Sequence, residues 1–416
     1  MSGYPSESAL DHTMPSKFNS ILNKSRLRTL AFALVGSLIC LLVLFASNRA
    51  PTHLNYSSVL LSNSDASQQA PIVPAEKEEV KVASPLAQDV TQKPKVIRTQ
   101  LIDDEARYEK TVYVNQQASS ANDEATVLIV SSIGSEHAFG DGRTIRDFVH
   151  TLNTFEYEKN AISLGFLCGT EAVKLQALKY FDYLMKDKPS EFNWARVTVF
   201  RESFLGANFG RHADGSSIQR ARRRMIARSR NLALLKSLND ERYTLFLDAD
   251  MYVIRNTDML QLFIESGHDI IVPRVEKHGD RDYDRNTWKG RRVHPSEEVL
   301  QLMNEDKWEE ANWEPNDGPD MLHLGAEIER LDKFPEGAPE RSPKYAFEVD
   351  SVGGAILFAK SIIYEQGVIF PPIYIVGTDW DRVEGYDGIE TEGICYVATL
   401  LGYKCWAMPN LVADHV

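Results

Sequence analysis

The segment Tyr243-Thr244-Leu245-Phe246-Leu247-Asp248-Ala249-Asp250 is an apolar run that ends in two carboxylates one residue apart. A short run rich in aromatic and aliphatic residues predicts a buried strand. Alternate side chains of a strand share a face, so Asp248 and Asp250 can converge on one divalent cation where the strand ends. That geometry suits the diphosphate of a nucleotide. An acidic pair in a solvated loop is the alternative interpretation.

Strands and helices alternate before this segment. The sequence predicts strands at 126–130, 161–167 and 197–200, and helices at 144–152 and 172–185. This βαβα order predicts an α/β fold with a mainly parallel sheet and helices on both faces. Ligands of such sheets bind beyond the carboxyl ends of the strands, which is where Asp248 and Asp250 are expected.

A long basic helix is predicted at 217–238, with Ser216 as its N-cap. One stripe of this helix carries polar and apolar residues together: Arg220, Arg224, Arg228, Asn231, Leu235 and Leu238. The apolar end of the stripe must face the core, so its basic end is expected to point inward. Buried guanidinium groups need an anion, which is either a diphosphate or a carboxylate of the domain. Arg222, Arg223 and Arg230 are expected in solvent.

Further elements follow the acidic pair. A helix at 259–264 is predicted to end at Gly267, and a strand at 269–272 is predicted to be closed by Pro273. The charged stretch from 276 to 346 contains Trp288, Trp308 and Trp313. A tryptophan in such a segment either stacks on the apolar face of a sugar or anchors the loop to the core.

Candidate polar residues recur near the C-terminus. Asp350 stands just before Gly353-Gly354, where glycines allow a ligand to approach the backbone. Glu390 and Glu392 open a helical pattern and can complement its dipole, although a ligand-binding role for Glu392 is equally open. His415 is a potential imidazole ligand for manganese beside the aspartates, with a solvated histidine as the alternative.

The N-terminal region predicts a membrane anchor. Residues 29–48 carry no charge, and 20 helical residues span about 30 Å. Basic residues precede this segment, which predicts a cytosolic tail (1–28), a transmembrane anchor (29–47), a stem (48–122) with an outlying helix docking from about 96, and a lumenal domain (123–416). A cleaved signal peptide is the alternative. The net charge of −13 argues against nucleic acid as a partner.

The chain has four cysteines, and Cys40 lies inside the predicted anchor. Three remain for an oxidising lumen, so they cannot all pair within the chain. Cys395 and Cys405 form either a disulfide or two buried thiols.

Several motifs together resemble the fungal mannan-polymerase family of Golgi mannosyltransferases, glycosyltransferase family 62. The motifs lie at Ile162–Leu167, Ala227–Asn231, Leu247–Asp250, Asp269–Pro273, Tyr283–Trp288, Glu348–Gly354, Glu390–Gly393 and Pro409–Leu411, followed by His415. The resemblance implies a GT-A fold, GDP-mannose as donor, Mn²⁺, and retaining transfer to a mannan or N-glycan acceptor. It also implies paralogous mannosyltransferase subunits as partners and a single-pass type II protein of the Golgi membrane.

The same resemblance implies residue roles. Asp250 would bind the metal directly, Asp248 would contact the donor and the metal, and His415 would supply the C-terminal ligand. Arg224 and Arg228 would bind the substrate and help to stabilise the leaving diphosphate. Asn231 and Trp288 would also bind the substrate. Asp350 and Glu392 would lie on the sugar side.

Three functions compete. The first is a catalytic mannosyltransferase that starts or extends a mannan backbone, with an α-1,6 linkage favoured over α-1,2. The second is a non-catalytic structural subunit of a mannan polymerase. The third is a membrane-tethered phosphohydrolase with Asp248 as nucleophile, which is disfavoured because Tyr252 stands where that class usually has Thr or Val.

Overall fold

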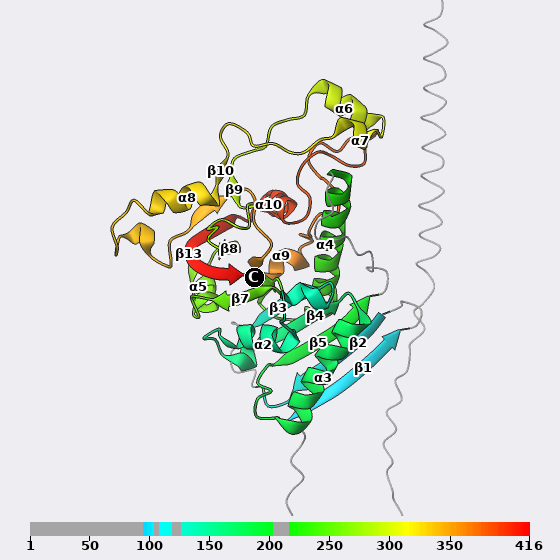
Figure 1. The fold of residues 1–416 in the computed structure, drawn as a ribbon, viewed down its shortest axis with the longest axis vertical. Helices are drawn as coiled ribbons and strands as arrows, with labels where there is room; N and C mark the ends of the chain where they lie inside the picture. The colour runs from blue at the N-terminus through cyan, green and yellow to red at the C-terminus, as the bar shows by residue number, and fades with distance from the viewer. Residues whose placement is uncertain (1–94, 104–107, 119–125, 203–215) are drawn as a thin grey trace, which may run out of the picture. The chain divides into compact units, whose positions relative to one another are not determined.

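The structure is a computed structural model that describes residues 95–103, 108–118, 126–202 and 216–416 (Figure 1). The predicted tail, the anchor and most of the stem lie outside these residues. Within the described part of the chain, no helix combines the length and apolar character needed to cross a membrane.

The described residues form one eleven-stranded mixed sheet in the order β1-β2-β5-β4-β3-β6-β12-β8-β13-β11, with β7 paired to β13. The strands are β1 (Val96–Asp103), β2 (Tyr108–Asn115), β3 (Val127–Ile133), β4 (Ile162–Cys168), β5 (Arg196–Glu202), β6 (Tyr243–Leu247), β7 (Met251–Ile254), β8 (Ile270–Glu276), β11 (Phe347–Val349), β12 (Ile356–Lys360) and β13 (Cys405–His415). A second, two-stranded sheet joins β9 (Trp288–Lys289) to β10 (Leu322–His323).

The sheet is parallel only in part. Strands β5, β4, β3 and β6 are parallel neighbours, and β13 is parallel to β8. Strand β12, however, lies antiparallel between β6 and β8. The expectation of a mainly parallel sheet is therefore right for the first block and wrong for the rest. Because β12 runs against β6, Ile356 pairs with Leu247, and the residues that precede β12 arrive beside Asp248.

Helices cover both faces of the sheet, as expected from the alternating pattern (Figure 1). One face packs against α2 (Ile145–Asn153), α3 (Glu171–Asp187) and α5 (Met259–Ser266). The other packs against α4 (Ser216–Ser237), α8 (Leu324–Leu331), α9 (Ser361–Glu365) and α10 (Thr391–Leu400). Two short helices, α6 (Glu297–Asn304) and α7 (Trp308–Ala311), lie in the charged stretch.

Two local predictions are wrong. The expected docking helix is the β1–β2 hairpin, and β2 pairs with β5, so this part of the expected stem belongs to the sheet. Its β-branched and aromatic residues favour strands, and Ile97 pairs opposite Val114. Strand β8 also continues through Pro273, which is tolerated because the register of the neighbouring β13 shifts after Met408, the partner of Pro273.

The two cysteine alternatives are resolved. Cys395 in α10 and Cys405 in β13 form a disulfide with Cα atoms 6.0 Å apart, and Cys168 is a buried thiol. The disulfide ties the helix that begins at Glu390–Glu392 to the strand that ends at His415.

Candidate functional site

Asp248 and Asp250 lie at the carboxyl end of β6, as predicted, but they contact different partners. The chain leaves the strand at Leu247 and turns, with the Met251 amide donating to the Asp248 carbonyl at 3.1 Å. The Asp248 Oδ1 atom lies 3.3 Å from Nη2 of Arg230. The Asp250 Oδ2 atom lies 3.2 Å from Nε2 of His415. The turn therefore separates the two carboxylates that an extended strand would have aligned.

The end of β13 lies beside β7 (Figure 1). This pairing places His415 opposite Met251 and holds it against Asp250. Its side chain is 8% exposed, and its ring centroid lies 4.4 Å from that of Tyr283. Burial lowers the pKa of His415, but the hydrogen bond and charge of Asp250 outweigh it and raise the pKa above its usual value. The alternative of a solvated histidine is therefore wrong.

Arg230 forms the buried positive centre behind Asp248. Its side chain is 7% exposed, and its Nε lies 3.2 Å from Oε1 of Glu390, which is also 7% exposed. Its Nη2 donates to the Gly354 carbonyl at 2.8 Å, while its Nη1 is buried without a hydrogen-bond partner in the described structure. Burial lowers the pKa of Arg230, but the carboxylates around it produce a net rise.

Asp284 orders the backbone near Asp248. Its Oδ2 accepts from the amides of Gly354, at 2.5 Å, and Ala355, at 2.9 Å. A Cβ on Gly353 would lie 2.3 Å from this oxygen, and a Cβ on Gly354 would lie 2.6 Å from Nη2 of Arg230. In this structure, the two glycines therefore admit Asp284 and Arg230 to the backbone.

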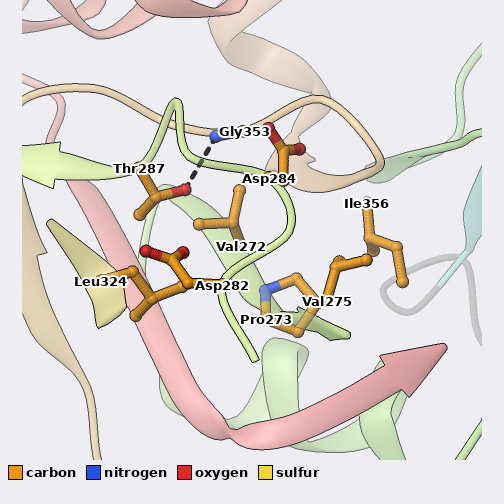
Figure 2. Close-up of a pocket in the computed structure, with 9 residues that line it drawn as sticks. All are labelled: Val272, Pro273, Val275, Asp282, Asp284, Thr287, Leu324, Gly353 and Ile356. Carbon is orange, nitrogen blue, oxygen red and sulfur yellow. Dashed lines mark hydrogen bonds between the residues drawn. The ribbon is translucent and has the colours of Figure 1, made fainter. Parts of the chain in front are cut away.

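A small pocket borders these residues. Figure 2 shows Asp284 and Thr287 near Gly353, whose amide donates to Oγ1 of Thr287 at 2.9 Å, while Asp282 lies beside Leu324. Its apolar lining comes from Val272, Pro273, Val275, Leu324 and Ile356. The pocket therefore lies between β8, the loop that carries Asp284 and the start of β12.

Negative charge is concentrated around Asp248, although 45% of its side chain is exposed. The crowded surroundings raise the pKa of Asp248 by removing hydration, and Arg230 opposes this rise. Neighbouring carboxylates raise it further: Asp250, Asp284 and Glu390. A cation would relieve this repulsion.

The residues present fit a cation that is shared with a ligand. The described residues contain no group of three His, Cys, Asp or Glu side chains placed to hold a metal by themselves. Asp250 and His415 nevertheless face each other, and carboxylate and imidazole both suit Mn²⁺. Cations at nucleotide sites commonly take one or two protein ligands and complete their shell with phosphate oxygens.

The inward face of α4 differs from the prediction. Arg228 is exposed and Leu235 is 76% exposed, so the expected stripe faces partly outward. The inward stripe is Arg223, Ala227, Arg230 and Leu234; both arginines were expected in solvent, but the side chain of Arg230 is 7% exposed and that of Arg223 is 19% exposed. Small residues explain the error, because the helix approaches β4 so closely that a Cβ on Gly165 would lie 2.4 Å from Oγ of Ser237.

The remaining predicted binding residues of α4 have partners within the protein. Arg224 forms an ion pair with Glu384, whose side chain is 7% exposed. The side-chain amide of Asn231 donates to the Phe370 carbonyl at 2.8 Å and accepts from the Phe370 amide at 2.9 Å. These contacts hold the chain that follows α9, so the structure gives both residues a packing role.

Glu392 and Glu390 begin α10 inside the protein. Glu392 is 1% exposed, and its Oε1 lies 2.6 Å from Arg223 and 3.0 Å from Arg292, while its Oε2 is buried without a hydrogen-bond partner. Glu390 has φ +57° and ψ −128°, a strained conformation for a residue other than glycine. Its ion pair with Arg230 goes beyond the expected interaction with the helix dipole.

The predicted sugar-side residues fall into two groups. Asp350 is exposed, and its Oδ2 accepts from the Gly290 amide at 2.7 Å. Trp288 is fully buried, with the Arg292 guanidinium 4.3 Å from its ring centroid, so its predicted stacking on a sugar is wrong. Trp308 lies against Arg220, and Trp313 donates to the Tyr386 carbonyl at 3.1 Å, as expected of loop anchors.

The sequence interpretation missed three residues of the site: Arg230, Asp284 and Glu390. All three lie inside motifs quoted for the resemblance, so a signal for each was present. The sequence did not show where each side chain lies. The position of Arg230 depends on how α4 packs on the sheet, and that of Asp284 on a loop that contacts Gly354 and Ala355, about 70 residues away.

Fold and site together define an α/β protein with an acidic, cation-compatible site at the carboxyl ends of parallel strands. Residues 106–374, more than half of the chain, match the Anp1 family model. The chain belongs to the Anp1 family. The resemblance to mannan-polymerase proteins is thereby confirmed.

Curated relatives have related names. The mannan polymerase complex subunit MNN9 of Candida albicans is 25% identical over 285 residues, covering 65% of this chain and 71% of that protein. The mannan polymerase II complex anp1 subunit of Schizosaccharomyces pombe is 26% identical over 290 residues, covering 65% and 60%. The ANP1 subunit of Saccharomyces cerevisiae is 26% identical, and the match spans 51% of its length.

Solved structures show a more distant similarity. A mannosyltransferase from Pyrobaculum calidifontis in complex with GDP-Man and Mn²⁺ gives a TM-score of 0.35 at 10% identity, covering 70% of this chain and 56% of that one. GalNAc-T7 with UDP, GalNAc and Mn²⁺ gives 0.36 at 14% identity, covering 70% and 43%. Similarity at this level does not establish a shared fold or function.

Proposed function

We propose that this chain is a retaining α-mannosyltransferase with a GT-A fold, which uses GDP-mannose and Mn²⁺ and acts as a subunit of a mannan polymerase. Membership of the Anp1 family and the names of the relatives support the assignment to mannan synthesis. The observation that carries the catalytic part is the meeting of Asp248, Asp250, His415 and Arg230 at the carboxyl end of β6.

Asp250 and His415 would hold the metal. When bound, a divalent cation neutralises the charge that develops on the departing nucleoside diphosphate. The protein contributes the position of its own groups. Arg230 and the Ala355 carbonyl, which accepts from the Asp248 amide at 2.9 Å, hold Asp248 with almost half of its side chain open to a ligand. Asp248 can then accept hydrogen bonds from the hydroxyl groups of the donor.

Asp284 and Glu390 support this arrangement through different contacts. Asp284 fixes the Gly354–Ala355 backbone against the end of β6, and Glu390 fixes the guanidinium of Arg230. Neither residue is assigned as a nucleophile. Arg228 is exposed on α4, so its part in stabilising the leaving diphosphate has no support from burial.

The cellular setting extends the proposal. The uncharged segment 29–47 supports a single-pass type II protein of the Golgi membrane, with the described residues in the lumen. The acceptor would be the mannan backbone of N-linked glycans, with an α-1,6 linkage favoured over α-1,2. Paralogous mannosyltransferase subunits are the proposed partners, because the relatives are named as subunits of mannan polymerase complexes.

Replacing Asp250 by alanine tests the catalytic proposal. The full chain, alone and with a paralogous subunit, is assayed for transfer from GDP-mannose to short α-mannosides with and without Mn²⁺. We expect Asp250→Ala to lower kcat by about a hundredfold or more, on the order of 3 kcal/mol of transition-state stabilisation. Asp187→Ala removes an exposed carboxylate at the end of α3 and serves as the control.

Two results would overturn this assignment. Full activity of a folded Asp250→Ala variant would remove the metal-binding role of Asp250. Failure of the unmodified chain to bind GDP with Mn²⁺, while it still assembled with its partner, would identify a structural subunit instead. The phosphohydrolase alternative has no support from the family.

A further inference from the structure

Trp380 differs from every other tryptophan of the chain. All six tryptophans lie among the described residues, and Trp194 and Trp288 are buried in the core. Three more are partly covered: Trp308, Trp313 and Trp406. Trp380 is 99% exposed, and the nearby Val383 is 84% exposed. Since large aromatic side chains gain most from burial, this exposure needs a reason.

The exposed ring stands on a narrow hairpin. The Asp379 amide donates to the Arg382 carbonyl at 2.9 Å, and the Arg382 amide donates to the Asp379 carbonyl at 3.1 Å, which leaves Trp380 and Asp381 at the tip. The Trp380 amide also donates to Oδ1 of Asp379 at 2.6 Å. The backbone of the tip is thus defined by hydrogen bonds on both sides of the tryptophan.

The hairpin is anchored to the body of the domain. Arg382 donates to the Gly377 carbonyl at 2.6 Å and contacts the side chain of Asn304 at the end of α6. Glu384 forms the ion pair with Arg224 of α4. A Cβ on Gly385 would lie 1.8 Å from the Val376 carbonyl oxygen, so the two sides of the hairpin meet too closely for any other residue. These contacts fix the hairpin that exposes Trp380 to solvent.

The base of the hairpin leads to the proposed transfer site. Asp387 lies 4.0 Å from Arg292, which contacts Glu392 at 3.0 Å. Arg224, which holds the hairpin, precedes Arg230 by six residues of α4, about 9 Å along the helix axis. Asp387 follows Trp380 by seven residue steps, which span about 25 Å at most when extended. Trp380 is thus connected to the transfer site through the base of the hairpin, but its 99% exposed ring is not packed against Asp248.

We propose that Trp380 is a stacking platform for pyranose rings of a mannan acceptor, at a subsite remote from the transfer site; this inference rests on the proposed function. Sugars present apolar C–H faces that pack on an indole ring, and their hydroxyl groups need acceptors at the rim. Asp379 and Asp381 flank Trp380 and are exposed. A long acceptor reaches both Asp248 and Trp380, whereas a short one reaches only the first.

The surroundings of Trp380 disfavour other ligands. A stable protein interface buries about 800 Å² on each partner around a cluster of apolar anchors, but this tip offers only Val383 and one aromatic ring, which is flanked by two carboxylates. An anionic membrane surface attracts basic segments, and Asp379 and Asp381 would oppose it. A neutral, polyhydroxylated chain matches a flat ring with acidic neighbours.

Glycan titration of the full chain without donor tests this inference. We expect Trp380→Ala to weaken binding of a long α-mannan oligosaccharide about tenfold, and to leave binding of a short α-mannoside unchanged. Trp380→Phe should retain most of the affinity because it keeps a flat ring. Leu400→Ala removes an 86% exposed side chain elsewhere and is the control. Equal thermal midpoints will establish that the variants are folded.

The outcomes separate this inference from the proposed function. Unchanged affinity of Trp380→Ala for the long oligosaccharide overturns the subsite. So does a loss of assembly with a paralogous subunit at unchanged glycan affinity, which would make Trp380 a protein contact. Asp250→Ala should abolish transfer yet bind the long oligosaccharide normally. If the unmodified chain binds it through Trp380 but transfers no mannose, the catalytic proposal alone fails.

Discussion

Replacing Arg230 by methionine tests whether the buried charges of the site hold one another in place. The side chains of Arg230 and Glu390 are each 7% exposed, so the loss of the guanidinium leaves a buried carboxylate without its partner. Breaking a buried ion pair in this way costs about 3–5 kcal/mol. Asp248 adds little to this figure, since it is 45% exposed and water screens its charge. We expect the free energy of unfolding to fall by about 3–5 kcal/mol.

The double variant Arg230→Met with Glu390→Gln separates loss of a pair from loss of packing. Removing both charges leaves no buried ion, and such replacements are often close to neutral. The double variant should therefore lie within about 2 kcal/mol of the unmodified protein. In a double-mutant cycle, the double variant should therefore lose less stability than the sum of the losses of the two single variants.

Urea and thermal denaturation provide the measurement. At about 2 °C per kcal/mol, Arg230→Met should lower the thermal midpoint by about 6–10 °C. Arg281→Met is the control, because its ion pair with Asp332 is 44% and 40% exposed and should contribute less than about 1 kcal/mol. The reasoning is refuted if Arg230→Met costs less than about 1 kcal/mol, or if the two substitutions simply add.

Two further predictions concern a glycine of the site and a buried ion pair at the amino ends of β5 and β6. Gly354→Ala places a Cβ 2.6 Å from Nη2 of Arg230 and should cost about 1–3 kcal/mol in thermal denaturation, whereas Gly134→Ala, with nothing within 4 Å, should not. Burial raises the pKa of Glu241, but Arg196 outweighs it, so the pKa in the folded state is lowered from 4.5. The stability that this ion pair provides is present at neutral pH and should be lost as the pH falls below about 4.5. In Glu241→Gln, the free energy of unfolding, measured against pH, should therefore fall less steeply below about pH 4.5.

Local patterns predicted the elements around the acidic pair. The helix expected at 172–185 is observed at Glu171–Asp187, and the strand expected at 161–167 is observed at Ile162–Cys168. These elements follow from the periodicity of their own residues. The direction of β12 does not, since it depends on the path of the chain after β8. Consequently the sequence did not predict that Gly354 and Ala355 lie beside Asp248.

The face of α4 shows where periodicity fails. The helix is rich in arginine, and its leucines spread around the axis, so the apolar moment does not identify one face. Its contact with the sheet is made through small residues, Ala227 and Ser237, which carry little weight in a hydrophobic pattern. If the inward face of α4 had been assigned from its small residues, Arg230 would have been predicted to face inward and Arg228 outward.

The separation of Asp248 from Asp250 has a consequence for how the site works. Asp248 depends on Arg230, and through it on α10, because Glu390 fixes the guanidinium. Asp250 depends instead on His415, which is placed by the pairing of β13 with β7. The support of Asp248 comes from helices α4 and α10 and that of Asp250 from strand β13, so a change that loosens Arg230 should disturb the donor contacts of Asp248 while leaving the proposed metal ligands in position. Cation affinity and donor affinity should then respond to different substitutions, although their two carboxylates are separated by a single alanine.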